Sequence, residues 1–560
     1  MNRVLSFFCL MLCFYSCNPV PDNTASFSSF FYKGNDKVFT DSIDYHNQYF
    51  NPVLCGFYPD PSICRKGDDF FLVNSSFSFY PGIPIFHSKD LVNWVQMGHV
   101  LERPEQLNLD GIRISGGIYA PAIKYNKHND TFYLVTTCVD GIGNFVVKTK
   151  DPSGHWSDPI LLPDVGGIDP SLFFDEDGKA YIVNNDAPEG EPKWDGHRAI
   201  WIHEYDVASD RTFGTSKVIV DGGVDKSKKP IWIEGPHIYK RNGKYLLICA
   251  EGGTGINHSQ VAFISDQVFG PYIPFEGNPI LTQRDLPDNR INKVTNVGHA
   301  DIVEDTDGKT WAVFLGCRPY EGNYYNTGRE TFLLPVEWKG EAPVILPHEE
   351  QVPLIVYKDN LQAGDRKFSG NFVWKDNFEK DSLDMRWLMI RTPREKWYEI
   401  KESQLRLQLL PTNIYTVEQP AFLGVRQQHT SFEVETELTF YPTSPQEIAG
   451  LVCFQNEEYN IVFGKTFQNG KQTLVVDKAS KTVSRIASLE ISDEYVNRPL
   501  RLKITGDGKN YSFYASFTDK NWQPVLENVD GRNLSAEKAG GFVGNIIGLY
   551  ASSQSSLPDI

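Results

Sequence analysis

Acidic residues precede apolar, strand-like segments at three well-separated points of the chain. Asp60 stands in YPDPS, Asp169 in GIDPS and Glu234 in IEGPH. A carboxylate in an apolar strand is costly to bury unless it is paired, protonated or used in a reaction. Two carboxyl groups of opposite protonation state are what general acid and base catalysis requires. These three residues are therefore the first candidates for a shared site.

A repeated phrase places the three acids in corresponding positions. Each copy has a small or acidic residue, usually followed by Pro, then an apolar strand, a polar turn and a second apolar strand, which is the pattern of a β-hairpin. The copies align at Pro61, Pro121, Pro170, Pro236 and Ala300. Successive copies are 60, 49, 66 and 64 residues apart, which suits four-stranded propeller blades with loops. The sequence predicts a five-bladed β-propeller over residues 47–345.

Residues in the same phase of a propeller face one another, because the first strand of every blade lines the central channel. Asp60, Asp169 and His299 share a phase, and Glu234 lies one residue earlier. Taken alone, each residue fits a turn or a salt bridge; together they predict one site. Inverting glycoside hydrolysis needs a protonated carboxyl and a carboxylate roughly 6.5 to 9.5 Å apart. Burial beside Trp232 and a neighbouring negative charge would keep the acid protonated.

Several motifs resemble glycoside hydrolase family 43, the five-bladed propellers that include β-xylosidases, α-L-arabinofuranosidases and arabinanases. They begin with residues 51–101, NPVLCGFYPDPSICRKGDDFFLVNSSFSFYPGIPIFHSKDLVNWVQMGHVL. SGGIYAP, GGIDPSLFFDEDG, IEGPHIY, AEGGT, VGHADIV and GCRP follow in the family's order. The resemblance implies that Asp60 is the general base and Glu234 the general acid. It implies that Asp169 tunes the pKa of the acid and orients it.

The resemblance also implies a set of sugar-binding residues. Arg318 in GCRP matches a position that contacts the terminal sugar, and His237 in IEGPH is assigned to the same set. Tyr119 in SGGIYAP replaces a Trp that walls the pocket in many β-xylosidases of this branch, and Phe79 lies in the aromatic stretch SFSFYPG. GGFVGNIIG resembles a segment that lends a Phe to the pocket, which makes Phe542 a candidate.

A metal site is a further implication of the resemblance. His299 in VGHAD matches an axial histidine that in some members helps to hold a calcium ion or a water. One histidine is not a coordination sphere, so a hydrogen-bonded channel histidine is the alternative. The predicted chemistry requires no cofactor, and a structural calcium at the propeller axis is left open.

The predicted function is exo-acting, inverting release of terminal α-L-arabinofuranosyl residues from plant hemicellulose, such as arabinoxylan or xyloglucan oligosaccharides. The changed wall at Tyr119 favours this sugar. β-D-Xylosidase activity, alone or in addition, is the alternative, because the two sugars place comparable hydroxyl groups. A non-catalytic carbohydrate-binding propeller is an alternative from another class, since a fold does not dictate function. The pairing of Asp60 with Glu234 argues against a pure binder.

A second β-rich region follows a Pro-rich segment. Residues 346–367 are predicted to be a linker, and residues 368–560 carry alternating segments such as SFEVETELTF and PLRLKITG. This alternation predicts a sandwich of two sheets, which resembles the concanavalin-like domain of the exo-acting branch. The whole chain is therefore predicted to be all-β. The sandwich is either a structural flank or an independent carbohydrate-binding module; Trp374, Trp387 and Trp397 favour the flank, since such residues are more often core.

The first residues indicate an export signal. Arg3 is followed by the apolar run VLSFFCLMLCFY, which is too short to span a bilayer comfortably. FYSC resembles a lipoprotein signal in which Cys17 is lipidated, although Phe14 stands where Leu is usual; an ordinary secretory signal is the alternative. Residues 1–17 are predicted to be the signal and residues 18–46 a polar spacer. The expected location is the periplasm, with a lipid anchor, and the cell surface is the alternative.

Composition excludes some partners. The net charge is -17, from 54 Lys and Arg against 71 Asp and Glu, and no basic run is present, so no nucleic-acid partner is expected. Contact with a membrane is expected only through the lipid anchor. The six cysteines beyond the leader have no metal-ligand spacing, which favours buried thiols over a zinc site or a disulfide framework. A bridge between Cys55 and Cys64 is left open.

Overall fold

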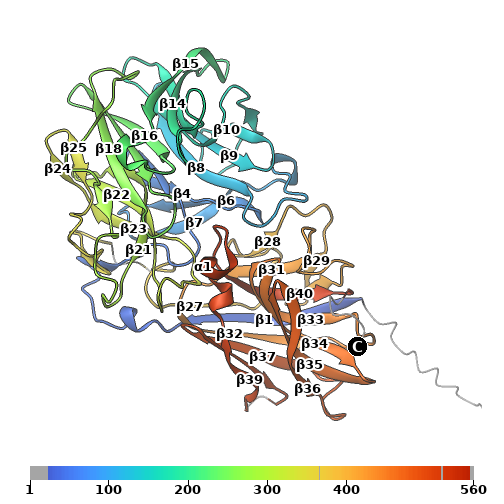
Figure 1. Cartoon of the computed structure of the whole chain (residues 1–560). Helices are drawn as coiled ribbons and strands as arrows, with labels where there is room; N and C mark the ends of the chain where they lie inside the picture. Colours follow the sequence, from blue (N-terminus) through green and yellow to red (C-terminus); the bar gives the residue numbers. More distant parts are fainter. Residues whose placement is uncertain (1–22, 363, 365, 519–520, 555–560) are drawn as a thin grey trace, which may run out of the picture.

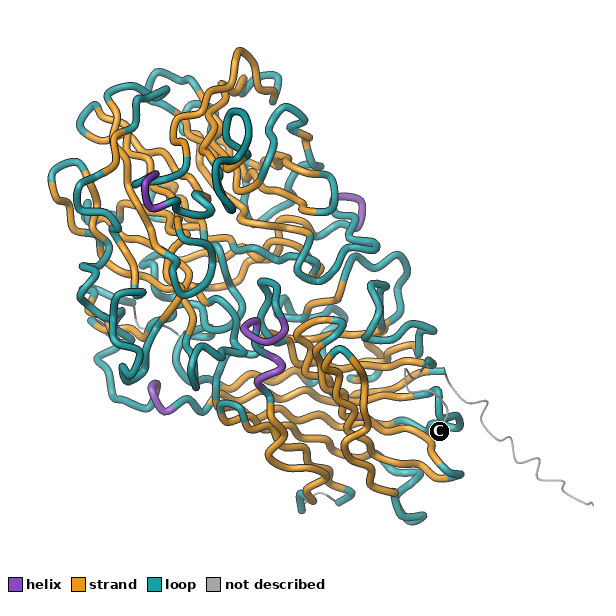
Figure 2. Tube along the Cα trace, viewed as in Figure 1, coloured by secondary structure: helices purple, strands orange, loops and turns teal. Residues whose placement is uncertain are grey.

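The computed structural model describes residues 23–362, 364, 366–518 and 521–554. Two β-rich parts are visible, a propeller and a sandwich (Figure 1), and strands make up both (Figure 2). The described helices are the single turn α1 (Ala536–Ala539) and four 3-10 turns, Lys37–Phe39, Pro104–Gln106, Lys226–Lys228 and Arg532–Leu534. The predicted all-β class, with a five-bladed propeller followed by a sandwich, is confirmed.

Five antiparallel sheets form the blades. Their first strands are β3 (Ser62–Lys66), β8 (Gly117–Asn126), β12 (Ile168–Phe174), β16 (Glu234–Arg241) and β21 (Thr295–Glu304). These strands contact one another in a ring, β3 to β8 to β12 to β16 to β21 and back to β3, so they surround the axis. The outer strands are β4 (Asp69–Val73), β6 (Gly82–Ser88), β7 (Val95–Leu101), β9 (Thr131–Val139), β10 (Gly143–Thr149), β11 (Ile160–Leu161), β13 (Ala180–Asp186), β14 (Ala199–Asp206), β15 (Arg211–Asp221), β17 (Lys244–Glu251), β18 (Ser259–Ser265), β19 (Ile273–Pro274), β20 (Leu281–Thr282), β22 (Thr310–Cys317) and β23 (Glu330–Pro335).

The ring is closed by a segment from its own beginning. The backbone N–H groups of Val53 and Leu54 donate to the carbonyl of Thr331 in β23, at 2.9 and 3.2 Å. Tyr58 N–H donates to the carbonyl of Arg329 at 3.1 Å. Residues just before blade one therefore hold the last blade in place.

The predicted linker is part of the folded structure. Residues 346–367 contain β26 (Ile355–Tyr357), which pairs with β2 (Gln48–Phe50). The hairpin β24 (Glu337–Lys339) and β25 (Ala342–Val344) precedes it. Residues 346–367 are therefore not a free linker, because part of this segment pairs with the strand that leads into the propeller.

A backbone feature recurs at the inner end of every blade. Asp60, Ala120, Asp169, Gly235 and His299 have φ angles of 50°, 36°, 56°, 56° and 52°. Positive φ is uncommon for residues other than glycine. In blades two to five the hairpin register also shifts at this point, as it does at a β-bulge. A bulge re-aims a side chain out of the strand pattern, so the same irregularity turns one residue per blade toward the axis.

The sandwich consists of two eight-stranded sheets. The first has the order β29 (Tyr398–Lys401), β30 (Gln404–Gln408), β1 (Thr24–Gly34), β32 (Ser431–Thr439), β37 (Leu500–Asp507), β38 (Asn510–Ser516) and β39 (Gln523–Asp530), with β27 (Val373–Asp376) also on β1. The second has the order β36 (Thr482–Glu490), β35 (Lys471–Ser480), β34 (Tyr459–Gln468), β33 (Ile448–Asn456), β40 (Ile546–Ser552), β31 (Ala421–Arg426), β28 (Leu388–Ile390) and β5 (Phe79–Tyr80).

The predicted spacer is wrong at residues 24–34, which form a strand of the sandwich. Thr24–Gly34, within the predicted spacer 18–46, forms β1 between β30 and β32. Figure 1 shows this blue strand inside the orange sandwich. Phe27, Phe30 and Tyr32 are buried in the sandwich core. The segment alternates apolar and polar residues with one bulge, so it pairs as a strand although it precedes the propeller.

The sandwich and the propeller share an apolar interface and one strand. β5, from the first blade's β4–β6 connection, pairs with β28 as the edge of the second sandwich sheet. Arg391 donates from Nε to the carbonyl of Ile112 at 2.7 Å, and Arg426 donates from Nε to the carbonyl of Phe57 at 2.6 Å. Both arginines are buried. These contacts favour the structural flank over an independent module.

Three further sequence predictions concern the export signal, a membrane span and the cysteines. The predicted signal with Cys17 lies outside the described residues. Among the helices that the structure describes, none is long and apolar enough to cross a membrane. Cys55, Cys64 and the other four described cysteines are buried free thiols, so no bridge joins the near pair.

The place of β1 gives a first prediction. A chain beginning at residue 35 should be insoluble or melt far below a chain beginning at residue 23, because it loses the burial of Phe27, Phe30 and Tyr32, each worth about 1.5–3 kcal/mol. Thermal unfolding followed by circular dichroism measures the difference. Equal melting temperatures would show that the strand is dispensable.

Candidate active site

One pocket of about 460 Å³ collects residues from all five blades and from the sandwich. Its lining is Asp60, Phe77, Tyr119, Val139, Ile168, Asp169, Arg198, Trp232, Glu234, Gly253, Thr254, His299, Arg329 and Phe542. Asp60, Asp169 and Glu234, which are far apart in the sequence, therefore meet in one place. They come from the inner ends of blades one, three and four.

Asp60 is held as a carboxylate. Arg329 Nη1 donates to its Oδ1 at 2.8 Å, and the Ser75 hydroxyl donates to its Oδ2 at 2.6 Å. Burial raises the pKa of Asp60, but the charge of Arg329 and the Ser75 hydrogen bond contribute to an opposing effect that outweighs burial. The pKa consequently lies below its ordinary value, and Asp60 is ionised at neutral pH, as a general base must be.

Glu234 is held as an acid. Burial raises its pKa well above the ordinary value, and the negative charges of Asp169 and Asp60 raise it further. Asp169 accepts a hydrogen bond from Gly235 N–H at 3.2 Å, which places this carboxylate against the backbone next to Glu234. Burial, aided by the charge of Asp60, raises the pKa of Asp169 to about 6. The pKa of the base Asp60 is thus lowered and the pKa of the acid Glu234 is raised.

Gly235 is required for this arrangement because a Cβ at this position would lie 2.9 Å from the His299 ring. Its φ of 56° is close to those of Asp60, Asp169 and His299, so the backbone conformation alone does not demand glycine. The position that carries an acid in blades one and three is therefore glycine in blade four. Glu234, one residue earlier, supplies the carboxyl group instead.

An ionised carboxylate and a protonated one in a single pocket can activate a water and protonate a leaving oxygen. Among the described residues, no group of three or more His, Cys, Asp or Glu is arranged to hold a metal ion. The pocket can therefore perform acid and base catalysis with its own side chains.

Family models match both parts of the chain. Residues 49–343 match the glycosyl hydrolases family 43, and residues 375–557 match the beta xylosidase C-terminal concanavalin A-like domain. The chain belongs to glycosyl hydrolases family 43. It is a glycosidase with a concanavalin-like sandwich, as the sequence predicts.

Similar proteins span almost the whole chain. The xylosidase/arabinosidase of Butyrivibrio fibrisolvens is 40% identical over 518 residues, 91% of this chain and 96% of that protein. The non-reducing end alpha-L-arabinofuranosidase BoGH43B of Bacteroides ovatus is 35% identical over 515 residues, 90% of this chain and 91% of that protein. The crystal structure of a GH43_12 from a capybara gut metagenome has a TM-score of 0.88 and 44% identity, covering 94% of this chain and 99% of that one.

Three aromatic rings wall one side of this family 43 pocket. Phe542, from the loop between α1 and β40, stacks on Phe77 at 6.2 Å between ring centroids and meets Tyr119 edge-on at 5.8 Å. The Tyr119 hydroxyl donates to the Ser115 carbonyl at 2.5 Å, which fixes the ring, and burial raises its pKa to about 12. Two predicted substrate-binding residues, Tyr119 and Phe542, thus line the pocket.

The prediction that Phe79 lines the substrate pocket is wrong. It is fully buried in β5, where it pairs with Ile390 of the sandwich, and it does not line the pocket. Phe77 takes the predicted place. Its φ of 50° breaks the extended chain, so the two phenylalanines, although two residues apart, face different environments.

The prediction that Arg318 contacts the sugar in the pocket is wrong. It is buried away from the pocket, where Nε and Nη2 donate to Glu330 at 2.7 and 2.9 Å and Nη1 donates to Asp36 at 2.8 Å. Because Asp36 also accepts from Ser431 N–H at 2.7 Å, Arg318 ties the propeller to the sandwich. The arginine in the pocket is Arg329.

His237 also lies outside the pocket. It lines a separate cavity of about 10 Å³ that shares His299, Asp60 and Asp169 with the pocket. Burial lowers the pKa of His237 to about 3, so it is neutral. This cavity has room for about one water.

The residues around this cavity do not fit the predicted calcium. A calcium ion takes six to eight oxygen ligands. His299 offers nitrogen, Asp60 is already bound by Arg329 and Ser75, and the space cannot hold the waters that would complete the shell. His299 Nδ1 lies 3.9 Å from Asp60 Oδ1, and its role as a channel histidine stays a prediction.

Sequence reasoning missed Arg329, Arg198 and Phe77 as pocket residues, and it treated Trp232 only as a source of burial for the acid. Arg329 stands in TGRETF at the start of β23, where no propeller phrase marks it. Arg198 and Trp232 come from connections between strands. The spacing of the hairpin phrase says nothing about such positions, because loops carry no fixed period.

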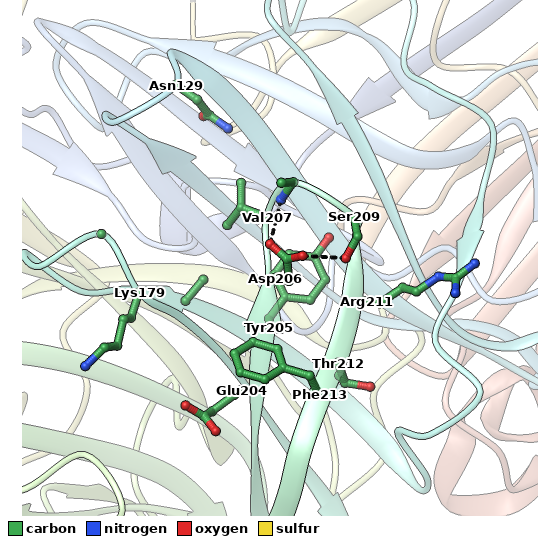
Figure 3. A pocket seen from close by; sticks show the side chains of 13 residues that line it. Asn129, Lys179, Glu204, Tyr205, Asp206, Val207, Ser209, Arg211, Thr212 and Phe213 are labelled. Carbon is green, nitrogen blue, oxygen red and sulfur yellow. Dashed lines mark hydrogen bonds between the residues drawn. The ribbon is translucent and has the colours of Figure 1, made fainter.

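A larger hollow on blade three is not a second catalytic site. Figure 3 shows it around Phe213 and Tyr205, with Glu204 and Lys179 beside them. Asp206 is engaged by Ser209 and the backbone of Ala208. None of the three predicted catalytic residues lines it.

Asp169→Asn should lower the upper limit of the pH profile. The substitution removes a negative charge that raises the pKa of Glu234, so Glu234 loses its proton at a lower pH and activity falls earlier as pH rises. The measurement is kcat/KM against pH for both proteins. An upper limb that stays in place, or moves to higher pH, would contradict this role of Asp169.

Phe77→Leu and Phe79→Leu form a matched pair. Phe77→Leu should reduce kcat/KM about tenfold, since it removes part of the pocket wall. Phe79→Leu should cost about 1–2 kcal/mol of unfolding free energy, with kcat/KM nearly unchanged. Urea unfolding and steady-state kinetics measure both. A larger fall in kcat/KM for Phe79→Leu than for Phe77→Leu would support Phe79 as the substrate-binding residue.

Proposed function

We propose that this glycosidase is an exo-acting, inverting enzyme that releases terminal non-reducing α-L-arabinofuranosyl residues from plant hemicellulose. The observation that carries the proposal is the meeting in one pocket of Asp60, bound by Arg329 at 2.8 Å, with the buried carboxyl groups of Glu234 and Asp169. Arabinoxylan and xyloglucan oligosaccharides are the proposed substrates. The reaction uses side chains and water, and it requires no cofactor.

The proposed reaction is a single displacement. The oxygen of a water attacks the anomeric carbon while Asp60 accepts a proton from that water. Glu234 gives its proton to the glycosidic oxygen as the bond between this oxygen and the anomeric carbon breaks. The products are the free sugar, with its anomeric configuration inverted, and the shortened chain. Asp60 then returns its proton to solvent and Glu234 takes one up. Asp169, which contacts Gly235, orients the acid and keeps it protonated.

Exo action is supported by the closed side of the pocket. Phe542 of the sandwich lies against Phe77 and Tyr119 of the propeller, and its N–H donates to the Ser115 hydroxyl at 3.1 Å. A chain running through the pocket would have to pass this wall. A single terminal sugar needs to enter only from the open side.

The choice of arabinofuranose rests on Tyr119 and on similar proteins. One is named an alpha-L-arabinofuranosidase and another a xylosidase/arabinosidase. β-D-Xylosidase activity, alone or together with the first, is the second candidate, and the double name of the Butyrivibrio protein favours it. A non-catalytic sugar-binding propeller would have no use for an acid and a base with separated pKa values.

We further propose that the enzyme is exported to the periplasm and tethered by a lipid on Cys17, with the cell surface as the alternative. Only the leader sequence supports this location. The partner is then a hemicellulose oligosaccharide, and the membrane is contacted through the anchor alone.

The test is turnover of 4-nitrophenyl α-L-arabinofuranoside and 4-nitrophenyl β-D-xylopyranoside, with arabinoxylan oligosaccharides beside them. Arabinofuranoside should dominate, and proton NMR should show the inverted anomer first. Glu234→Gln should lower kcat on the oligosaccharides by about 10²–10⁴, since a general acid contributes this much.

Glu251→Gln is the matched control. Glu251 is another buried glutamate of blade four, outside the pocket, and its substitution should leave kcat nearly unchanged. Dominant turnover of the xyloside would support the proposed catalytic site but reject arabinofuranose as the preferred sugar. No turnover by the unmutated enzyme, with oligosaccharide binding retained, would favour the binding propeller.

A further inference from the structure

The segment before the acid holds an exposed aromatic ring on an unusual backbone. Trp232 is 39% exposed and has a φ of 51°. Bulky side chains rarely adopt this conformation. Strain of this kind persists only where the surroundings impose it, and it is concentrated at functional sites such as ligand clamps. Trp232 stands two residues before Glu234, so its placement has a bearing on the reaction.

Four hydrogen bonds fix residues 230–233 in this shape. They are Trp194 Nε1 to Pro230 O at 2.8 Å, Gly252 N to Ile231 O at 2.9 Å, Trp232 N to Gly196 O at 2.9 Å and Asn185 Nδ2 to Ile233 O at 2.5 Å. A Cβ on Gly196 would lie 2.9 Å from the Ile231 side chain, so the two segments are in close contact. Blades three and four together hold the Trp232 backbone in its exposed position.

Arg198 is fixed beside this ring. Its guanidinium carbon lies 5.1 Å from the Trp232 ring centroid, and its Nε and Nη2 donate to Asn185 Oδ1 at 3.1 and 2.9 Å. Asp186 Oδ1 is 3.7 Å away. Within the described part of the chain, Nη1 makes no hydrogen bond. An oriented donor and an aromatic ring thus lie together in the pocket wall.

The base and the acid come from different blades of the ring. Among the pocket residues, Asp60, Phe77, Tyr119, Arg329 and Phe542 come from blades one, two and five and from the sandwich. Glu234, Trp232 and Arg198 come from blades three and four and from their connections. Because Glu234 protonates the leaving oxygen, the leaving chain must lie on the acid's side.

We infer that Trp232 and Arg198 form the binding site for the first neutral sugar of the leaving chain. The inference rests on the proposed function and adds a second sugar site to it. An indole ring offers an apolar surface to the carbon face of a pyranose, and a fixed guanidinium offers N–H donors to its hydroxyl groups. This pair selects leaving groups that are sugars over leaving groups that are small alcohols.

The test compares substrates with the same terminal sugar and different leaving groups. For the preferred sugar, kcat/KM is measured on an oligosaccharide and on the methyl glycoside, and their ratio is the readout. Trp232→Ala and Arg198→Met should each lower this ratio roughly 10- to 100-fold, the loss expected when a sugar contact disappears. Trp232→Phe, which keeps an aromatic ring, should recover part of it.

Phe213→Ala is the control, because Phe213 is an exposed aromatic residue on the far hollow of blade three (Figure 3). Its ratio should equal that of the unmutated enzyme. Unchanged ratios for Trp232→Ala and Arg198→Met, in proteins whose thermal unfolding is normal, would overturn the inference. Equal losses on both substrates would overturn it as well, since the residues would then serve the chemical step. Absence of turnover by the unmutated enzyme would instead reject the proposed function.

Discussion

A single positive charge separates the base from the acid among three buried carboxyl groups. Asp60, Asp169 and Glu234 share one pocket, and buried carboxyl groups that share a site cannot all be ionised. Arg329 binds Asp60 directly, so Asp60 keeps its negative charge. That charge and burial then raise the pKa of the other two. The division of labour between base and acid follows from the position of one guanidinium.

The guanidinium can do this because the propeller brings separate blades to one axis. Arg329 precedes β23 in the last blade, whereas Asp60 precedes β3 in the first. The two blades are joined where Tyr58 and Leu54 bind the backbone around Arg329. Closure of the ring and ionisation of the base therefore depend on the same stretch of chain. The positive φ at the inner end of each blade then aims Asp60 and Asp169 into the space that closure creates.

The sequence was sufficient to predict those parts of the site that recur at the same position of each repeated hairpin. A hairpin phrase repeated five times predicts blades, and residues in one phase of it, such as Asp60 and Asp169, must meet. Residues placed by irregular backbone escaped this reasoning. Phe77 replaces Phe79 because of one positive φ. Arg329 replaces Arg318 because Arg329 meets Asp60 in the pocket, whereas Arg318 pairs with Glu330 and Asp36 outside it. Thr24–Gly34 did carry a strand signal, since its apolar residues alternate, but nothing local shows that its partners lie at the other end of the chain.

β1 makes the propeller, in terms of connectivity, an insertion within the sandwich. Ser28 bonds Glu437 across 409 residues, and nearly all partners of β1 are synthesised after the last blade. During synthesis this strand emerges before the propeller and before its partner strands, with Phe27 and Phe30 uncovered and its backbone unpaired. An unpaired apolar strand is a template for association with other chains. The nascent protein therefore needs either a holding chaperone or a propeller that folds quickly enough to shorten the wait, and the yield of correctly folded enzyme depends on how long that first strand stays alone.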